Sequence, residues 1–398
     1  MKLRPGMSNA LAFTEEQAMV LDSAREFCRD KSPVSAVRAL LRDETGFDPE
    51  VWRAMAELGW MGLAIPDAFG GAGLDIGTTV PLAECMGRAL LATPFISTTL
   101  AAQALLRAGT ASQQERWLPL LASGTVATVA LQDDGDWGAE STRCVVNRDG
   151  DRLVLSGTKY FVQDAMASGV ILVHCRLDGE PALVLVETRG LRMSPHALID
   201  ETRRAARVEL DGVRVGVDAL LDRSRTPATL RDLRLLGALL VAAESTGSTA
   251  ACLDTVVEYL KTRKQFGKLI GAYQALKHPT VDMLCAMDAS RSLIYHAATL
   301  VGSAALDVEA EIACRMAKAQ ASEALAFAGD RAVQFHGGMG FTYECDAQLY
   351  IRRAQHSRQL FGDPWHHRKH LARLLLDDVG QGSSTARNTH DSRNKEKL

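Results

Sequence analysis

Hydrophobic and polar positions along this chain change their spacing twice. In the first ~125 residues the apolar positions recur at helical intervals. They predict helices over residues 13–28, 52–60, 80–92, 98–108 and 113–121. Helical spacing returns after Pro227 and lasts to about residue 378. It begins with a long run over 230–262 that only Gly237 and Gly247 interrupt.

Between these helical parts the chain has short β-branched runs separated by Gly, Asp and Asn. The runs cover residues 126–131, 142–147, 152–156, 170–174 and 182–186, with a hairpin-like piece over 208–215. Such runs predict an antiparallel sheet or a small barrel. The sequence therefore predicts an α+β protein with a helical domain over 12–124, a β domain over 125–225 and a helical domain over 226–379. Residues 380–398 are too polar to bury a core, so we expect a disordered tail there.

Composition places few limits on function but excludes some classes. The hydrophobic content of 47% and the charged content of 23% are ordinary for a globular protein. The net charge of −3 gives no basic surface for nucleic acid. The 8 cysteines are scattered without a C-x-x-C pair, which indicates reduced thiols in the cytoplasm. No apolar run approaches the ~18 residues of a membrane span, and no secretory leader is visible.

Two segments in the last third carry the most specific motifs. The first reads Tyr-Leu-Lys-Thr-Arg-Lys-Gln-Phe-Gly over 259–267, and the second reads Gln-Phe-His-Gly-Gly-Met-Gly-Phe over 334–341. Further pieces are Gly-Trp-Met-Gly-Leu-Ala-Ile-Pro at 59–66 and Ser-Gly-Thr-Lys-Tyr-Phe-Val at 156–162. In this order and spacing they resemble the acyl-CoA dehydrogenase flavoprotein family, over residues ~12 to 376.

The resemblance implies a helical domain, a β domain and a carboxy-terminal four-helix bundle. It also implies FAD as cofactor and α,β-dehydrogenation of an acyl-CoA thioester to the 2-enoyl-CoA. Electrons would pass to electron transfer flavoprotein, and the chain would work in a homo- or hetero-oligomer, a dimer of dimers. Six residues would hold the FAD of a neighbouring subunit: Arg263, Gln265, Phe266, Gln334, Gly337 and Gly338.

Arg263 is suited to this role by its chemistry. A guanidinium offers a planar fork of two donors to a pyrophosphate, where lysine offers only a point charge. The alternative is an arginine that favours the carboxyl end of a long helix. The glycines after Gln334 do not form a G-x-G-x-x-G fingerprint, so a Rossmann nicotinamide site is a poor interpretation.

The β domain departs from the family pattern at the flavin. The usual Thr-Glu-Pro-Gly-x-Gly-Ser-Asp stretch is Gln-Asp-Asp-Gly-Asp-Trp-Gly over 132–138 here, with three carboxylates. Where Trp-Ile-Thr-Asn is usual, the chain has Phe161, Val162, Gln163 and Asp164. We expect Phe161 to cover the isoalloxazine as an aromatic wall and Gln163 to replace the threonine hydroxyl near the flavin edge.

The catalytic base of the family is missing. Phe361 occupies the position of the usual glutamate, and Gly237 occupies the alternative position on the long helix. Phe361 keeps the backbone N–H that helps to stabilise the enolate in the family. The remaining candidates are Glu244, about 10 Å further along that helix, and Asp363, which is also a suitable N-cap before Pro364. A base from another chain, or none, also stays open.

A metal site at His366, His367 and His370 is not expected. His366 and His370 are four residues apart, but no glutamate lies between them, and Arg368 and Lys369 would repel a cation. The pattern favours a solvated helix face.

Three functions are compatible with these observations. The first is an FAD-dependent acyl-CoA dehydrogenase, an oxidoreductase acting on CH–CH groups in fatty acid β-oxidation, lipid metabolism or steroid degradation. The second is a non-catalytic partner subunit that completes the FAD site of a heterotetrameric dehydrogenase acting on a steroid side-chain or other bulky acyl-CoA. The third is a scaffold without flavin, against which the intact Arg263, Gln265, Phe266 and Gln334 argue.

Overall fold

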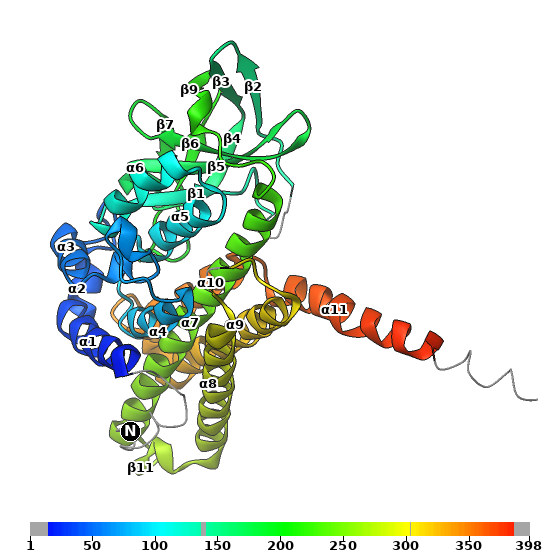
Figure 1. Cartoon of the computed structure of the whole chain (residues 1–398). Coiled ribbons are helices and arrows are strands. Elements are labelled where there is room, and N and C mark those ends of the chain that lie inside the picture. Colours follow the sequence, from blue (N-terminus) through cyan, green and yellow to red (C-terminus); the bar gives the residue numbers. More distant parts are fainter. Residues whose placement is uncertain (1–14, 137–140, 303, 386–398) are drawn as a thin grey trace, which may run out of the picture.

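The computed structural model describes residues 15–136, 141–302 and 304–385, which fold into helices, then strands, then helices again (Figure 1). The predicted α+β order is therefore confirmed. The first helical region contains α1 (Glu15–Lys31), α2 (Val34–Ala39), α3 (Pro49–Glu57), α4 (Thr79–Arg88), α5 (Phe95–Ala108) and α6 (Ala111–Ala122). Local capping starts several of these helices. Thr110 and Gln113 form a capping box before α6, and Asp48 accepts from the N–H of Glu50 at the start of α3.

The β region forms two sheets at one end of the molecule (Figure 1). Its strands are β1 (Ala127–Ala130), β2 (Val145–Asp149), β3 (Arg152–Ser156), β4 (Thr158–Gln163), β5 (Val170–Leu177), β6 (Glu180–Glu187), β7 (Arg192–Pro195), β8 (Ala205–Glu209) and β9 (Val213–Gly216). The larger sheet has the order β1-β5-β2-β3-β9 with β6 on β5, and the smaller has the order β4-β8-β7.

The prediction of an antiparallel sheet is wrong in two pairings. Strand β5 runs parallel to β1 and to β2. Nearly all of β5 is buried, which suits parallel pairing because both faces of such strands are covered. The hairpin expected over 208–215 is also wrong, since β8 pairs with β4 and β7 whereas β9 pairs with β3.

The last helical region contains α7 (Thr226–Thr262), α8 (Gln274–Leu300), α9 (Val308–His336), α10 (Ala347–Gln359) and α11 (Pro364–Thr385). A short hairpin, β10 (Lys264–Gln265) with β11 (Lys268–Leu269), joins α7 to α8. Five helices thus replace the expected four-helix bundle, with α9 packed against the other four. Helix α11 continues to Thr385, so the predicted tail is wrong for 380–385, and 386–398 lie outside the described residues.

Helix α7 is the central element of the molecule. It is long and apolar enough to cross a membrane, but 94% of its most apolar window is buried inside the protein. It packs against α4, α5, α8, α9 and α10 and runs from the β region to the hairpin β10–β11 (Figure 1). It is therefore a core helix that links the two ends of the fold.

Two glycines allow α4 and α7 to meet backbone to backbone. A Cβ added at Gly247 would lie 1.9 Å from the carbonyl oxygen of Glu84, and one added at Gly87 would lie 2.0 Å from the carbonyl oxygen of Glu244. Neither carbonyl belongs to a flexible side chain, so only movement of a whole helix would relieve such a clash.

We expect Gly247→Ala to destabilise the protein because the added methyl group forces α4 away from α7. Overpacking of this kind costs about 1–3 kcal/mol, which exceeds the helix propensity that alanine gains. Urea denaturation followed by circular dichroism measures the change. Gly135→Ala is the control, since a Cβ at Gly135 meets nothing within 4 Å. Equal stability of Gly247→Ala and the parent chain would contradict this account of the contact.

Candidate functional site

A cavity of about 270 Å³ lies where the β region meets both helical regions. Its walls come from α5, β1, β4, α7 and the segment 356–367. Much of the lining is apolar, including Ile96, Leu100, Val129, Leu235 and Val241. An enclosed apolar space with a few polar groups is the usual form of a small-molecule site.

Phe361 lies in this cavity wall, and its ring covers Gly237 of α7. A Cβ added at Gly237 would lie 2.6 Å from the ring of Phe361, so the ring rests on the glycine backbone. Phe361 has a φ of 58°, in the left-handed region. Its N–H donates no hydrogen bond within the described part of the chain. One aromatic ring therefore fills the space between the two expected base positions.

Glu244 lines the cavity but is held in an ion pair. Arg203 donates to its carboxylate, and both side chains are largely buried. Asp363 is not among the cavity-lining residues described. Its Oδ1 accepts from the N–H of His366 at 2.8 Å, as expected for an N-cap followed by Pro364. Of the two predicted bases, only Glu244 faces the cavity.

The segment that carries Phe361 is fastened by a buried lysine that sequence analysis missed. Lys318 Nζ donates to the carbonyl oxygens of Ser357 at 3.0 Å, Arg358 at 3.2 Å and Gly362 at 3.1 Å. Burial lowers the pKa of Lys318 to about 7. The sequence does carry a signal for this buried lysine. It lies between two alanines, at 317 and 319, on the buried side of a helix.

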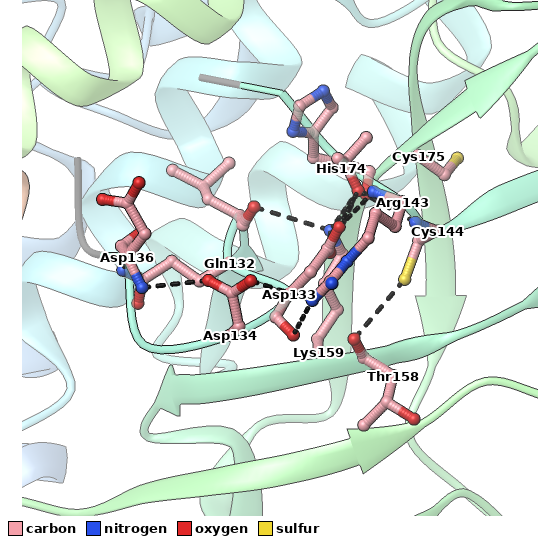
Figure 2. A network of polar contacts seen from close by, with 12 residues as sticks. Gln132, Asp133, Asp134, Asp136, Arg143, Cys144, Thr158, Lys159, His174 and Cys175 are labelled. Carbon is pink, nitrogen blue, oxygen red and sulfur yellow. Dashed lines mark hydrogen bonds and ion pairs between the residues drawn. The ribbon is translucent and has the colours of Figure 1, made fainter. Parts of the chain in front are cut away.

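A second buried lysine fastens the loop over 131–136 (Figure 2). Lys159 on β4 has no exposed surface, and its Nζ donates to Asp133 Oδ1 at 2.5 Å and to Thr142 Oγ1 at 2.8 Å. Asp134 pairs with Arg143 at 2.8 Å. Two of the three carboxylates noted in the sequence are thus neutralised by pairing. Leu131 and Gln132 are the loop residues that line the cavity beside β4.

Phe161 and Gln163 lie together in the cavity wall on β4. Phe161 stacks on His196 with ring centroids 4.4 Å apart and has a φ of 52°. The amide of Gln163 donates to the carbonyl of Phe161 at 3.1 Å. A flat aromatic side chain beside a hydrogen-bonding amide fits one face and edge of a flavin ring.

The other predicted cofactor residues lie at the far end of α7. Arg263, Gln265 and Phe266 belong to the exposed hairpin β10–β11, where Phe266 is 91% exposed. Gln334, Gly337 and Gly338 are exposed at the end of α9. Tyr259 stacks on His336 at 4.1 Å and brings these two groups side by side.

These exposed residues do not reach the cavity of their own chain. Arg263 is nineteen residues beyond Glu244 on α7, or about 28 Å along the helix axis. The predicted cofactor residues therefore form two groups: Phe161 and Gln163 in the cavity, and the other six on a distant exposed surface. Such a division fits a cofactor bound between two subunits.

The solvated helix face predicted for the three histidines is wrong for His367. It is 2% exposed, and His366 and His367 both line the cavity. Burial lowers the pKa of His367 to about 2, so it is neutral. The turn at Gly362, with a φ of 97°, directs this first part of α11 back into the cavity wall.

Sequence comparison matches both helical regions to known protein domains. Residues 14–125 match the sequence model of the acyl-CoA dehydrogenase N-terminal domain, and residues 235–376 match that of the C-terminal domain. The chain is 32% identical to acyl-CoA dehydrogenase IpdE2 of Mycolicibacterium smegmatis over 91% of this chain and 98% of that protein. It belongs to the acyl-CoA dehydrogenase family. IpdE2 of Mycobacterium tuberculosis is also 32% identical, over 88% of this chain and 94% of that protein.

Solved structures share the whole fold. The Tcur3481–Tcur3483 steroid ACAD, in a variant form, is 28% identical with a TM-score of 0.81 over 92% of this chain and 99% of that one. The ChsE4–ChsE5 complex from Mycobacterium tuberculosis, at 24% identity and a TM-score of 0.84, over 92% of this chain and 99% of that one, supports the fold alone. Acyl-CoA dehydrogenases are FAD-dependent oxidoreductases acting on CH–CH groups, so the expected cofactor and reaction class are confirmed at family level.

We expect Lys159→Met to destabilise the protein because it leaves Asp133 buried without its partner. Breaking a buried pair costs roughly 3–5 kcal/mol. Although burial raises the pKa of Asp133, Lys159 and the surrounding donors outweigh it and hold that pKa below its ordinary value. The parent chain should therefore keep this stabilisation above pH ~4 and lose it as pH falls through the lower folded pKa, and the variant should lack that dependence.

Urea denaturation at pH 7 and at a series of lower pH values tests this. Arg148→Met, at an exposed position on β2, is the control. The same loss of stability on acidification in Lys159→Met and in the parent chain would refute the role of the pair.

Proposed function

We propose that this chain is the supporting subunit of a cytoplasmic FAD-dependent acyl-CoA dehydrogenase built from two different chains. It completes the FAD site of its neighbour, and the carboxylate that removes the α-proton belongs to that neighbour. The observation that carries the proposal is the ring of Phe361 resting on Gly237, because it closes both positions from which the family's base would act.

The exposed surface at the end of α7 supports the first half of this proposal. Arg263 presents a permanent charge with no side-chain partner among the described residues, next to the exposed Gln265 and Phe266. Phe266 is held at a φ of 52°, a conformation that costs a non-glycine residue about 1–2 kcal/mol. A surface of this kind fits the pyrophosphate and adenine of an FAD whose flavin ring lies in another subunit.

The cavity supports binding of the acyl part of a CoA thioester in this chain. The free N–H of Phe361 is a donor for the thioester oxygen, and the apolar walls suit an acyl group. Bound FAD would supply the hydride acceptor of the family reaction in the subunit that holds its flavin ring. The residues of this chain would orient the thioester and exclude water, but Phe361 cannot accept the α-proton. Reoxidation by electron transfer flavoprotein belongs to the same proposal, as does the two-chain assembly that the name of the Tcur3481–Tcur3483 enzyme describes for that protein.

A second candidate function is dehydrogenation by this chain alone, with Glu244 as the base. Its support is that Glu244 lies in the cavity wall. The ion pair with Arg203 opposes it, because the guanidinium already occupies one oxygen of this carboxylate.

Purification of the chain alone and with a family member that retains the usual glutamate separates the two candidates. We expect the chain alone to reduce no dye with acyl-CoA, and the pair to be yellow and active. In the pair, Asp363→Asn should keep kcat within about twofold, because asparagine caps a helix as well as aspartate. Activity of the chain alone would overturn the proposal, and Glu244→Gln and Asp363→Asn would then be compared for a loss of about 10²–10⁴ in kcat.

Arg263→Ala should lower the FAD content of the pair without unfolding this chain, since Arg263 is exposed. Arg263→Lys should recover only part of it, because lysine lacks the planar fork. The flavin absorbance per protein after gel filtration measures the effect, with Arg148→Ala as an exposed control. Full flavin content in Arg263→Ala would exclude this residue from the cofactor site.

A further inference from the structure

One end of the cavity is polar in a way that neither the cofactor nor the dehydrogenation requires. Four side chains from different elements converge there: Ser97 on α5, Asp164 after β4, Arg203 between β7 and β8, and Glu244 on α7. The rest of the lining combines apolar side chains such as Leu100, Leu235 and Val241 with further arginines, Arg231, Arg234 and Arg315. In such a site the few polar groups fix the orientation of the ligand and its identity.

Each of the two carboxylates at this end accepts a hydrogen bond through only one of its oxygens. Ser97 Oγ donates to Asp164 Oδ2 at 2.5 Å, while no described residue donates to Oδ1. Arg203 donates to Oε1 of Glu244, and no described residue donates to Oε2. Neither of these two oxygens is fully enclosed by protein, so both are accessible from the cavity. Each is a hydrogen-bond acceptor that no described donor contacts, so a ligand that bonds to them must supply the donor.

The conformation of Asp164 shows that the chain holds this carboxylate in place. Its φ is 54°, in the left-handed region, and its N–H donates to the carbonyl of Arg204 at 3.0 Å. Burial raises the pKa of Asp164 to about 6 in spite of the hydrogen bond from Ser97. A strained backbone and an incompletely solvated acid are costs that a purely structural aspartate could avoid at this position.

Charge at the polar end excludes an acidic ligand. Arg203 is the one guanidinium available to Asp164 and Glu244, because Arg353 is taken by Asp200 at 2.5 Å. Arg204 is turned away and donates to the carbonyls of Leu40, Leu41 and Asp43. His356 is neutral, since burial lowers its pKa to about 4. Two carboxylates against one guanidinium disfavour a further negative charge and favour a neutral hydrogen-bond donor.

The position of the polar end gives the distance from the reacting carbons. Glu244 is seven residues after Gly237 on α7, which places it about 10 Å beyond the ring of Phe361. We propose that the acyl-CoA bound in this cavity carries a hydroxyl group about 10 Å from its α-carbon, and that this hydroxyl donates to Asp164 and Glu244. The proposal rests on the proposed function only in taking the cavity as the acyl site.

Paired 2-enoyl-CoA thioesters test this, because the product form can be bound without being dehydrogenated again. Chains of six, eight and ten carbons, each with and without a terminal hydroxyl, are titrated by calorimetry into the FAD-loaded pair of subunits. We expect the best hydroxylated thioester to bind roughly tenfold or more tightly than its plain match, as for a hydrogen bond to a charged group. A thioester with a terminal carboxylate should bind more weakly than the plain one.

The matched variants are Asp164→Asn and Asp178→Asn. Both aspartates have a φ near 55°, which asparagine accepts, but Asp178 is exposed in a β turn away from the cavity. Asp164→Asn should reduce the preference for the hydroxyl to below about threefold, and Asp178→Asn should leave it unchanged. Ser97→Ala, a smaller change, should also weaken the preference, because the carboxylate loses the bond that orients it.

Each negative result of this experiment leads to a different conclusion. Equal binding of plain and hydroxylated thioesters would overturn the hydroxyl proposal and leave the acyl site in place. A preference for the hydroxylated thioester that persists in Asp164→Asn would have the same consequence. Tighter binding of the carboxylate would mean that an arginine of the cavity wall recognises the ligand, and it would also overturn the hydroxyl proposal. If no thioester pair responds to variants of this chain, the cavity is not an acyl site, and that part of the proposed function fails.

Discussion

The packing of α7 is the constraint on which the rest of the structure depends. This helix touches α4 through backbone at Gly247, supports the ring of Phe361 at Gly237 and ends at Arg263. Because a helix moves as a rigid unit, the cavity wall and the exposed end of α7 cannot shift independently of each other. The position of the acyl site relative to the surface that faces a neighbouring subunit is therefore set by glycines whose only role is to lack a side chain.

Buried cations give the irregular segments a comparable rigidity. Lys159 and Lys318 have no exposed surface, Arg353 is 1% exposed, and each is bonded to a segment that has little regular structure of its own. The segments are the loop over 131–136, the turn over 357–362 and the loop over 200–202. A buried charge is stabilised by pairing and hydrogen bonding, so each cation favours one conformation of its segment, although Nη1 of Arg353 has no hydrogen-bond partner among the described residues. Two of these segments contribute to the cavity wall, and the third adjoins Arg203.

Sequence reasoning reached the helices and named candidate cofactor residues, which stay predictions, but it did not find the polar end of the cavity. Helical spacing is a local signal, so α1, α3, α5 and α7 were predicted to within a few residues. The strands β4 (Thr158–Gln163) and β7 (Arg192–Pro195) were missed because neither is a run of β-branched residues. The parallel pairing of β5 was missed because it has no local signature. Asp164 and Arg203 look like ordinary loop residues in the sequence. Only the fold brings them to Ser97 and Glu244, and the contact of Phe361 with Gly237 is equally invisible without it.

Three phenylalanines, Phe161, Phe266 and Phe361, have positive φ, and the sequence analysis predicts a cofactor or catalytic position for all three. Such a conformation costs a bulky residue of order 1–3 kcal/mol and persists only where the surroundings require it. At Phe361 the backbone N–H makes no hydrogen bond to a described residue, while the side chain fills the space of a base. Loss of the base with retention of the cavity is what we expect of a supporting subunit that binds a thioester without removing its α-proton. A chain that had lost all function would have no reason to keep the strain.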